Sequence, residues 1–220
     1  MNFCRANALR GCVVIFSAVL CVPAQAEDPK PTLENTINLQ LAEPVRPQAF
    51  ARPLKFFVAD VIDRSGNAQP LMVFKPRGGI FLDRPPVEIT RAGLETCLKS
   101  ANMLAADRES ADFLLTIYLF HFGLSDSSMD FFGKVEFAVM LKNPKTAKSQ
   151  QVAASGTSIA AAAVRKKNIQ KNVQEDIERA FTDALRNLLR GVKLRDAVTA
   201  LDSPIEGAPA AAASAGKPIQ

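Results

Sequence analysis

Apolar and polar residues alternate along this chain with two different periods, one typical of strands and one of helices. The run Leu54–Ile62 (LKFFVADVI) is rich in aromatic and β-branched residues and ends in the turn-forming sequence DRSGN, so it predicts a first strand. Two shorter extended pieces, Leu71–Phe74 and Gly79–Leu82, predict either a small hairpin or an irregular loop.

Two later segments repeat their apolar residues every three or four positions, which is typical of amphipathic helices. The first begins at Pro85-Pro86, where a missing amide donor does no harm, and Asn102 is its expected stop. The second ends at Gly191. The apolar stripes are Val87, Thr90, Leu94, Cys97, Leu98 and Ala101 in the first helix, and Val173, Ile177, Ala180, Phe181, Ala184 and Leu188 in the second.

Three strands are expected between these helices. Ala111–Phe122 (ADFLLTIYLFHF) is apolar on both faces, which predicts a central strand. Phe131–Leu141 alternates apolar residues with Lys134 and Glu136, as a half-buried strand does, and Gln151–Ala161 would return beside it. The resulting order β-α-β-β-β-α predicts an α/β domain of the α+β sandwich type. It would have a mixed sheet of about four strands, a meander of the last three, and two helices on one face.

The start of the chain has the three parts of a secretory signal peptide. Arg5 and Arg10 precede an apolar stretch, and small residues precede a cleavage site after Ala26. No cysteine follows a small residue at the end of that stretch, so a lipobox is absent. We therefore expect residues 1–26 to be removed and the mature chain to be soluble in a bacterial periplasm.

The remaining chain divides by composition. Residues 27–53 contain five prolines and little periodicity, which predicts a linker or arm, and residues 54–193 form a single α/β domain. The Ala/Pro-rich segment 194–220 is expected to be a disordered tail, because its last part from Ser203 buries too little apolar surface to offset ordering.

The charge balance argues against nucleic-acid binding, and the cysteine content excludes an intramolecular disulfide. Without Arg5 and Arg10, 25 of the 27 basic residues remain against 22 acidic ones, so nucleic-acid binding is not expected. Cleavage after Ala26 removes three of the four cysteines and leaves Cys97, so an intramolecular disulfide is excluded.

The region Leu54–Leu189 resembles the YajG family of uncharacterised bacterial envelope lipoproteins. The similar features are a first strand closing on VIDR at 61–64, a helix ending at Leu94–Ala101, an Ala111-Asp112 entry to a long apolar strand, and a late helix reached through Asn168 and Asn172. The resemblance implies an envelope location and a mixed-sheet domain, and it carries no catalytic residues. Family members are typically lipid-anchored, so the missing lipobox is a departure.

Candidate catalytic groups are few, and no cofactor or metal site is predicted. His121 is the single histidine and Cys97 lies on an apolar helical stripe, so a structural role is expected for both rather than a catalytic dyad. Asp60 and Asp63 are close enough for acid–base chemistry, and a hydrolase using them stays open as an alternative to a local ion pair or turn.

A basic cluster made by Arg165, Lys166, Lys167 and Lys171 precedes the last helix. It could bind anionic envelope polymer or lipid and so touch the outer membrane peripherally, although a run of charges is more often a solvated face.

The most informative feature is the second face of the central strand. Tyr118, Phe120 and Phe122 are expected to share it, extended by Phe132 and Met140 on the next strand. Large exposed apolar patches are rare on monomers, so the arm, a second copy or an envelope protein partner must cover these side chains. The leading hypothesis is therefore a non-catalytic protein-interaction or accessory module.

Overall fold

The computed structural model describes residues 36–41, 43–66, 72–74, 78–127, 130–159 and 169–203. The signal peptide, the start of the arm, most of the basic cluster and the end of the tail lie outside these ranges. The main element is a mixed sheet with the strand order β2-β5-β6-β7, in which β2 runs parallel to β5 and the other neighbours are antiparallel. Its strands are β2 (Phe56–Asp63), β5 (Phe113–Ser127), β6 (Asp130–Lys142) and β7 (Ser149–Ile159).

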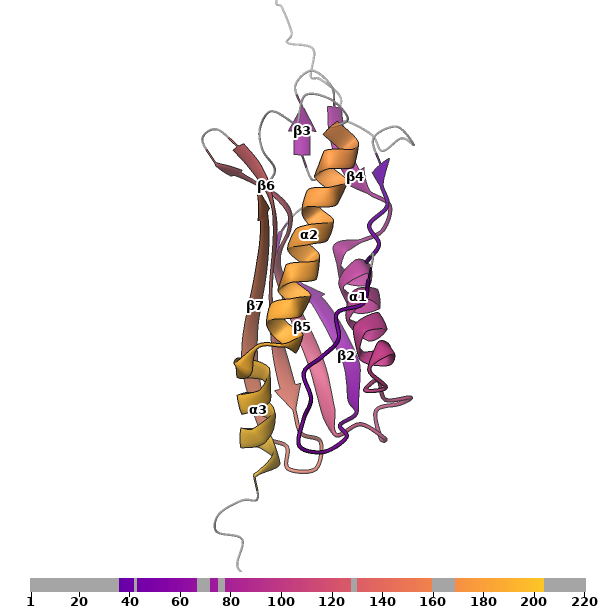
Figure 1. The fold of residues 1–220 in the computed structure, drawn as a ribbon, viewed down its shortest axis with the longest axis vertical. Coiled ribbons are helices and arrows are strands. Elements are labelled where there is room, and N and C mark those ends of the chain that lie inside the picture. The colour runs from indigo at the N-terminus through magenta and orange to yellow at the C-terminus, as the bar shows by residue number, and fades with distance from the viewer. Residues whose placement is uncertain are drawn as a thin grey trace, which may run out of the picture.

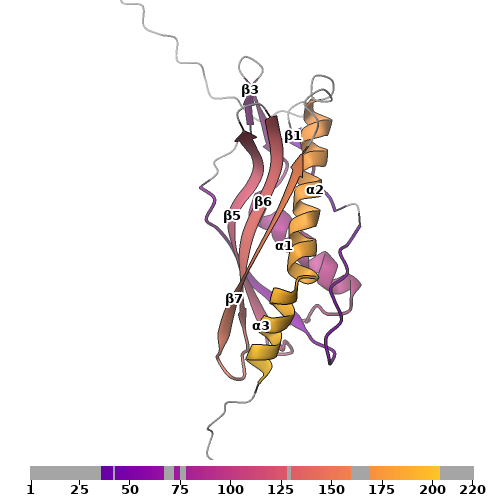
Figure 2. The ribbon, with the colours of Figure 1, turned by 60° about the vertical axis from the view of Figure 1, so that its left-hand side comes forward.

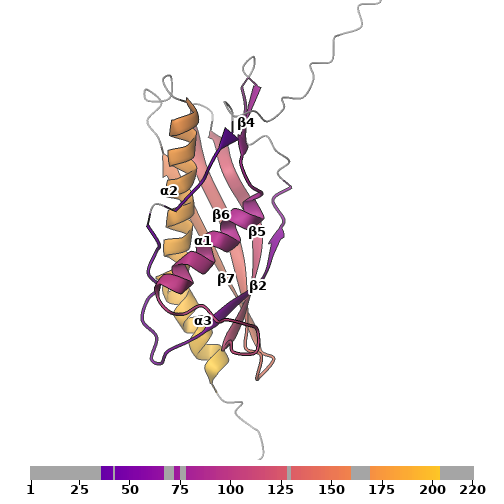
Figure 3. The same cartoon turned by 90° about the vertical axis from the view of Figure 1, so that its right-hand side faces the viewer.

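Helices α1 (Pro86–Ser100) and α2 (Ile169–Leu189) pack on the same face of this sheet (Figures 1 and 3). The predicted fold class, with a mixed four-stranded sheet and two helices on one face, is confirmed. Asn102 ends the first helix, as expected, with a positive φ of 55°. Among the helices that the structure describes, none is both long and apolar enough to cross a membrane.

A small second sheet lies at one end of the molecule (Figure 1). It contains β1 (Thr36–Ile37), β4 (Gly78–Leu82) and β3 (Met72–Phe74), in that order. The antiparallel pairing of β3 with β4 confirms the hairpin, which was one of the two expectations for this stretch.

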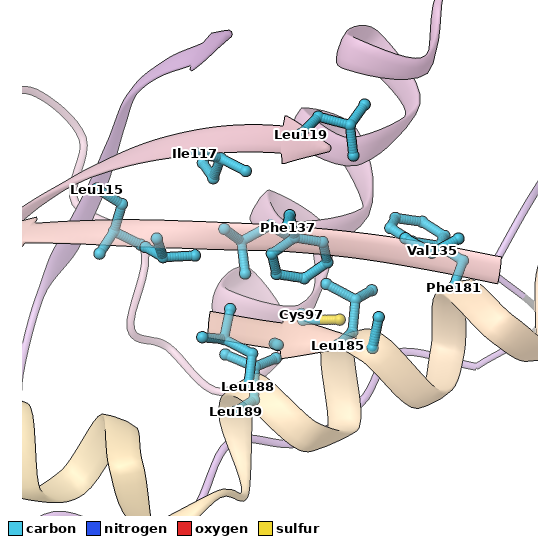
Figure 4. Close-up of a cluster of buried hydrophobic side chains, with 14 of the residues drawn as sticks. Cys97, Leu115, Ile117, Leu119, Val135, Phe137, Phe181, Leu185, Leu188 and Leu189 are labelled. Carbon is cyan, nitrogen blue, oxygen red and sulfur yellow. The ribbon is translucent and has the colours of Figure 1, made fainter. Parts of the chain in front are cut away.

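The core lies between the sheet and the helices. Alternate residues of β5 and β6 point into it, among them Leu115, Ile117 and Phe137, and they meet α1 at Cys97 and α2 at Leu185 (Figure 4). All five side chains are buried. At roughly 25 cal/mol per Å² of apolar surface removed from water, this layer is the main source of stability.

Two glycines allow α2 to lie directly against the sheet. A Cβ atom at Gly133 would come within 2.3 Å of the Asp176 carbonyl oxygen, and one at Gly156 within 2.1 Å of the Ala180 carbonyl oxygen. Because both obstacles are helix backbone, neither can move aside cheaply. The sequence at these positions therefore fixes how closely α2 approaches β6 and β7.

The arm belongs to the folded domain from residue 36 onward. Leu39 and Val45 are buried in the core, and Gln48 donates hydrogen bonds from its backbone to Leu189 O at 2.9 Å and from its side chain to Gly191 O at 3.0 Å. The expected linker is thus wrong for this part of the chain, because these apolar residues fill the space beside α1 and α2.

The predicted start of the tail at residue 194 is also wrong. Residues Val192–Asp202 form a third helix, α3, which buries Leu194, Ala197 and Leu201. Arg52 ties this helix to the arm and the sheet, because its guanidinium lies 2.9 Å from Asp202 and 3.1 Å from Asp112. The domain therefore extends past residue 193, to at least residue 202.

Candidate interaction surface

The second face of the main sheet is open. No helix or strand that the structure describes covers it, and Figure 2 shows the helices on one side of the sheet only. One end is closed by the segment after α1, where Ala105 and Ala111 are buried with Leu114 against Phe57 and Ala59. The described part of the arm packs on the helix side, so it does not cover the aromatic residues.

A β-bulge changes which aromatic side chains reach this face. Leu119 pairs with Phe137 and His121 with Glu136, so Phe120 is an extra residue without a partner in the ladder. An inserted residue shifts the alternation by one position. Phe120 therefore points outward and is 45% exposed, whereas Phe122 is 0% exposed in the core.

The placement of Phe122 on the outer face is thus wrong. Its ring meets that of Phe181 on α2 edge-on, with the centroids 5.5 Å apart, which is a favoured aromatic geometry. Phe122 contributes to the helix–sheet core and is unavailable to a partner.

The centre of the open face is built from β2, β5 and β6. Ile62 is in register with Tyr118, and Ala138 lies opposite Tyr118 on the other side. Ala138 points outward yet is only 1% exposed, because larger side chains surround it. We call the outward side chains of Ile62, Tyr118, Phe120 and Met140 the aromatic face.

Met140 and Phe132 both point outward from β6 and both are half-buried. Met140 pairs with Thr116, next to Tyr118, and so belongs to the aromatic face. Phe132 pairs with Ser125 farther along the strand, beyond an ion pair in which Lys134 Nζ lies 2.8 Å from Glu136 Oε2. The structure therefore separates Phe132 from the other candidate residues.

Polar groups border the aromatic face. The Arg64 guanidinium carbon lies 6.0 Å from the centroid of the Tyr118 ring, at the outer limit of a cation–π contact. His121 is half-buried beside the bulge, and its Nε2 has no hydrogen bond to any residue that the structure describes. Burial, followed by the charge of Lys134, lowers the pKa of His121 below its usual value, so the imidazole is neutral at pH 7.

Cys97 and His121 cannot form a dyad. Cys97 is buried in the core on the helix side of the sheet, whereas His121 points to the opposite side. Burial raises the pKa of the Cys97 thiol, against the opposing effect of a hydrogen bond with the Val45 backbone. The thiol is accordingly protonated and shielded, which confirms the expected burial.

Asp60 and Asp63 have separate local partners. Asp60 lies 3.8 Å from Arg91 of α1, and Asp63 Oδ1 accepts hydrogen bonds from the backbone N–H of Ser65 at 2.8 Å and from its hydroxyl at 2.6 Å. The second pattern is a turn stabilised by an aspartate side chain, as one of the expectations had it. Within the described ranges, no group of three or more His, Cys, Asp or Glu side chains is arranged to hold a metal ion.

The basic cluster is described only at Lys171. This side chain is 73% exposed and lies 3.9 Å from Glu175 one turn later on α2. Arg165, Lys166 and Lys167 lie outside the described residues, so anion binding stays a prediction.

Ile62 and Arg64 were missed as candidate residues. Both belong to the first predicted strand and its turn, and period-two alternation places Ile62 on the outer face once β2 is known to pair with β5. The alternation in the sequence could therefore have identified Ile62, but only with knowledge that β2 pairs with β5.

No protein-family model and no curated protein matches the sequence. Among solved structures, a DUF330 protein from Xanthomonas campestris is similar to this chain, with a TM-score of 0.52 and 12% identity over 73% of this chain and 95% of that one. A hypothetical protein from Chlamydia trachomatis gives a TM-score of 0.44 and 12% identity over 66% and 99% of the two chains. A lipoprotein from Neisseria meningitidis gives 0.27 and 14% over 56% and 97%. The likeness to the DUF330 protein shows that the two chains share a fold.

Proposed function

We propose that this protein is a non-catalytic interaction module of the bacterial cell envelope, and that the aromatic face binds another envelope protein. The observation that carries the proposal is the position of Phe120. The bulge in β5 directs this large apolar side chain outward on the open face of the sheet, where it is 45% exposed. Bulges commonly re-aim side chains at functional sites.

The composition of the face fits a protein partner. Phe, Tyr, Met and Arg are the residue types enriched in protein interfaces, and here Phe120, Tyr118 and Met140 lie together with Arg64 at the border. A partner with a compact apolar patch and a polar rim would bury the Phe120 ring. Binding through such a surface depends only weakly on salt.

The cellular setting is part of the proposal. The signal-like sequence up to Ala26 supports export and cleavage, and the resemblance to YajG proteins supports an envelope location. The lipobox is missing, which differs from the lipoprotein among the structural neighbours, so we propose a mature chain without a lipid anchor. Fractionation and intact-mass measurement of the exported protein test this, since a lipid-modified cysteine would contradict it.

The binding proposal is tested by co-purification from the native envelope with wild-type protein and Phe120→Ser. Loss of a central aromatic anchor commonly weakens binding by about 2 kcal/mol or more, which is roughly 30-fold. We expect a captured envelope protein to be depleted by that order in the variant, while the unfolding midpoint changes little.

Val192→Ser is the matched control. Val192 is the other exposed large apolar residue among those described, 58% exposed at the start of α3 on the helix side. The captured protein should be retained by this variant. Equal capture by Phe120→Ser and wild type would exclude the aromatic face as the binding surface, and equal loss in both variants would indicate general adhesion to apolar side chains.

A further inference from the structure

The outer edge of β7 is a long strand edge that no strand among the described residues pairs with. β7 is the last strand of the main sheet and pairs with β6 in an unbroken register from Ser149 opposite Lys142 to Ile159 opposite Phe132. Its sequence, SQQVAASGTSI, contains no charged residue and no proline. Natural sheets normally protect their edges with such residues, with bulges or with a covering segment.

The opposite edge of the same sheet shows that protection. Beyond β2, the Phe56 backbone exchanges hydrogen bonds with Met103 and Ala105. The strand also has a bulge after Val58, and the Val58 carbonyl accepts a hydrogen bond from Arg91 at 2.8 Å. These three features protect the edge at β2, whereas in the part of the chain that the structure describes the edge at β7 has one side-chain contact to its backbone, from Asn187 to the Ser155 carbonyl.

One contact shows which backbone groups of β7 point outward. Asn187 Nδ2 donates to the Ser155 carbonyl at 2.7 Å from α2, so this carbonyl faces away from β6. In an antiparallel strand the N–H and C=O of one residue point to the same side, and the side alternates along the strand. The groups of Gln151, Ala153 and Thr157 therefore face outward as well.

Helix α2 presents charged side chains beside this edge. Glu175, Glu178, Arg179, Asp183 and Arg186 line a groove together with Thr182 of α2 and with Thr157 and Ser158 of β7. Glu178 is engaged on the arm side of the helix, where it accepts hydrogen bonds from Gln174 Nε2 at 2.9 Å and from the Gln40 backbone N–H at 3.4 Å. The other four charged side chains are between 41% and 64% exposed and form two ion pairs within the helix, Arg179 with Glu175 and Arg186 with Asp183. Along the helix the signs of these four are negative, positive, negative, positive.

We propose that this groove binds an extended segment of another protein, which adds a strand antiparallel to β7. Ser158 contacts Asp176 and Ser155 contacts Asn187, so α2 runs antiparallel to β7 and an added strand would run parallel to α2. Main-chain hydrogen bonds to the outward groups of β7 provide affinity, and side chains that face α2 provide selectivity.

The spacing of the charges specifies the bound sequence. Glu175, Arg179 and Asp183 follow one another at four residues, about 6 Å along the helix axis, and Arg186 follows Asp183 at three residues, about 4.5 Å. Residues two apart on a strand are about 6.7 Å apart, so every second side chain of the added strand is near a successive charge of α2, with the spacing matching best from Glu175 to Asp183. The complementary pattern, read from the N-terminus, is basic-x-acidic-x-basic-x-acidic, with the first residue opposite Glu175 and the last opposite Arg186.

Helix α2 also argues against a second copy of the chain as the occupant. Gly156 of β7 lies directly beneath the backbone of Ala180 and Ala184. Two copies joined at β7 would be about 4.8 Å apart at the strands, whereas packed helices need 8–10 Å between axes. A single strand that carries no helix avoids this clash.

The test uses two labelled peptides of identical composition, KTEVKTE and ETKVETK, each with the full folded chain. We expect KTEVKTE to bind roughly tenfold more tightly at low salt, by fluorescence anisotropy, and to slow hydrogen exchange at the amides of Ser155 and Thr157, which lie beside the charged row. Asn187→Ala should bind it at least as well as wild type, because the Ser155 carbonyl becomes free.

A charge exchange in the protein provides the decisive control. In the double variant Arg179→Glu and Asp183→Arg, the preference should shift toward a peptide with the two central charges exchanged, KTKVETE. Three results would overturn the proposal. The wild type could bind all three peptides with equal affinity, the peptide could protect amides away from β7 from hydrogen exchange, or the chain could form dimers paired through β7. The aromatic face plays no part in this test, so Phe120→Ser should leave peptide binding unchanged.

Discussion

The bulge in β5 predicts opposite consequences for two phenylalanines that are two residues apart. Phe122 is fully buried against Phe181, so Phe122→Ala removes its packing and leaves a cavity, at a cost of about 3–5 kcal/mol in the free energy of unfolding. Phe120 is 45% exposed and leaves no enclosed cavity. Full burial of a phenylalanine contributes about 1.5–3 kcal/mol, so Phe120→Ala should cost about 1 kcal/mol or less.

Urea unfolding followed by far-ultraviolet circular dichroism measures both values, and unchanged m-values would show that the denatured state is comparable. The chain has no tryptophan and a single tyrosine, so the backbone signal is preferable to fluorescence. The bulge would be refuted if Phe120→Ala lowered the free energy of unfolding as much as Phe122→Ala or more. Phe122 would then lie on the outer face, as simple alternation predicts.

Three further predictions concern packing and charge. Gly156→Ala places a methyl group against the Ala180 carbonyl oxygen and should lower the free energy of unfolding by about 1–3 kcal/mol, whereas an unchanged urea midpoint would show that α2 does not lie this close to β7. Arg52→Ala removes two partly exposed ion pairs, so we expect a loss of about 1 kcal/mol or less together with faster hydrogen exchange in α3; exchange unchanged in α3 would contradict that link. Because the pKa of His121 is lowered in the folded state, its contribution to stability is present above about pH 6.5 and is lost as the pH falls below that value. The urea midpoint should thus decrease more between pH 7.5 and 5.5 in wild type than in His121→Gln, and identical decreases would exclude this assignment.

Periodicity alone predicted most of the architecture. The aromatic and β-branched run in β5 and the helical stripe through Ile177 and Ala184 are long, and tertiary packing reinforces both. The bulge could not be predicted in this way, because Tyr118, Phe120 and Phe122 have a perfect period of two. Only the pairing with β6 shows that one residue of the strand is extra.

The chain ends were predicted less well, for two different reasons. Leu194, Ala197, Val198 and Leu201 have helical spacing, but they follow Gly191 and adjoin an Ala/Pro-rich segment, so composition obscured the signal. Leu39 in the arm lies in an irregular stretch whose apolar residues reach the core without any period. Burial of such a segment depends on the gap between two helices, which is a property of the assembled fold.

Site-specific photocrosslinking from position 120 in the native envelope shows whether the aromatic face binds another protein. Lys99 is the matched control position, because it is exposed on α1 at the helix side of the sheet. We expect one dominant adduct with another envelope protein from position 120 and none of that mass from position 99. Crosslinks from position 120 only to the chain's own residues, or the same adducts from both positions, would contradict this expectation.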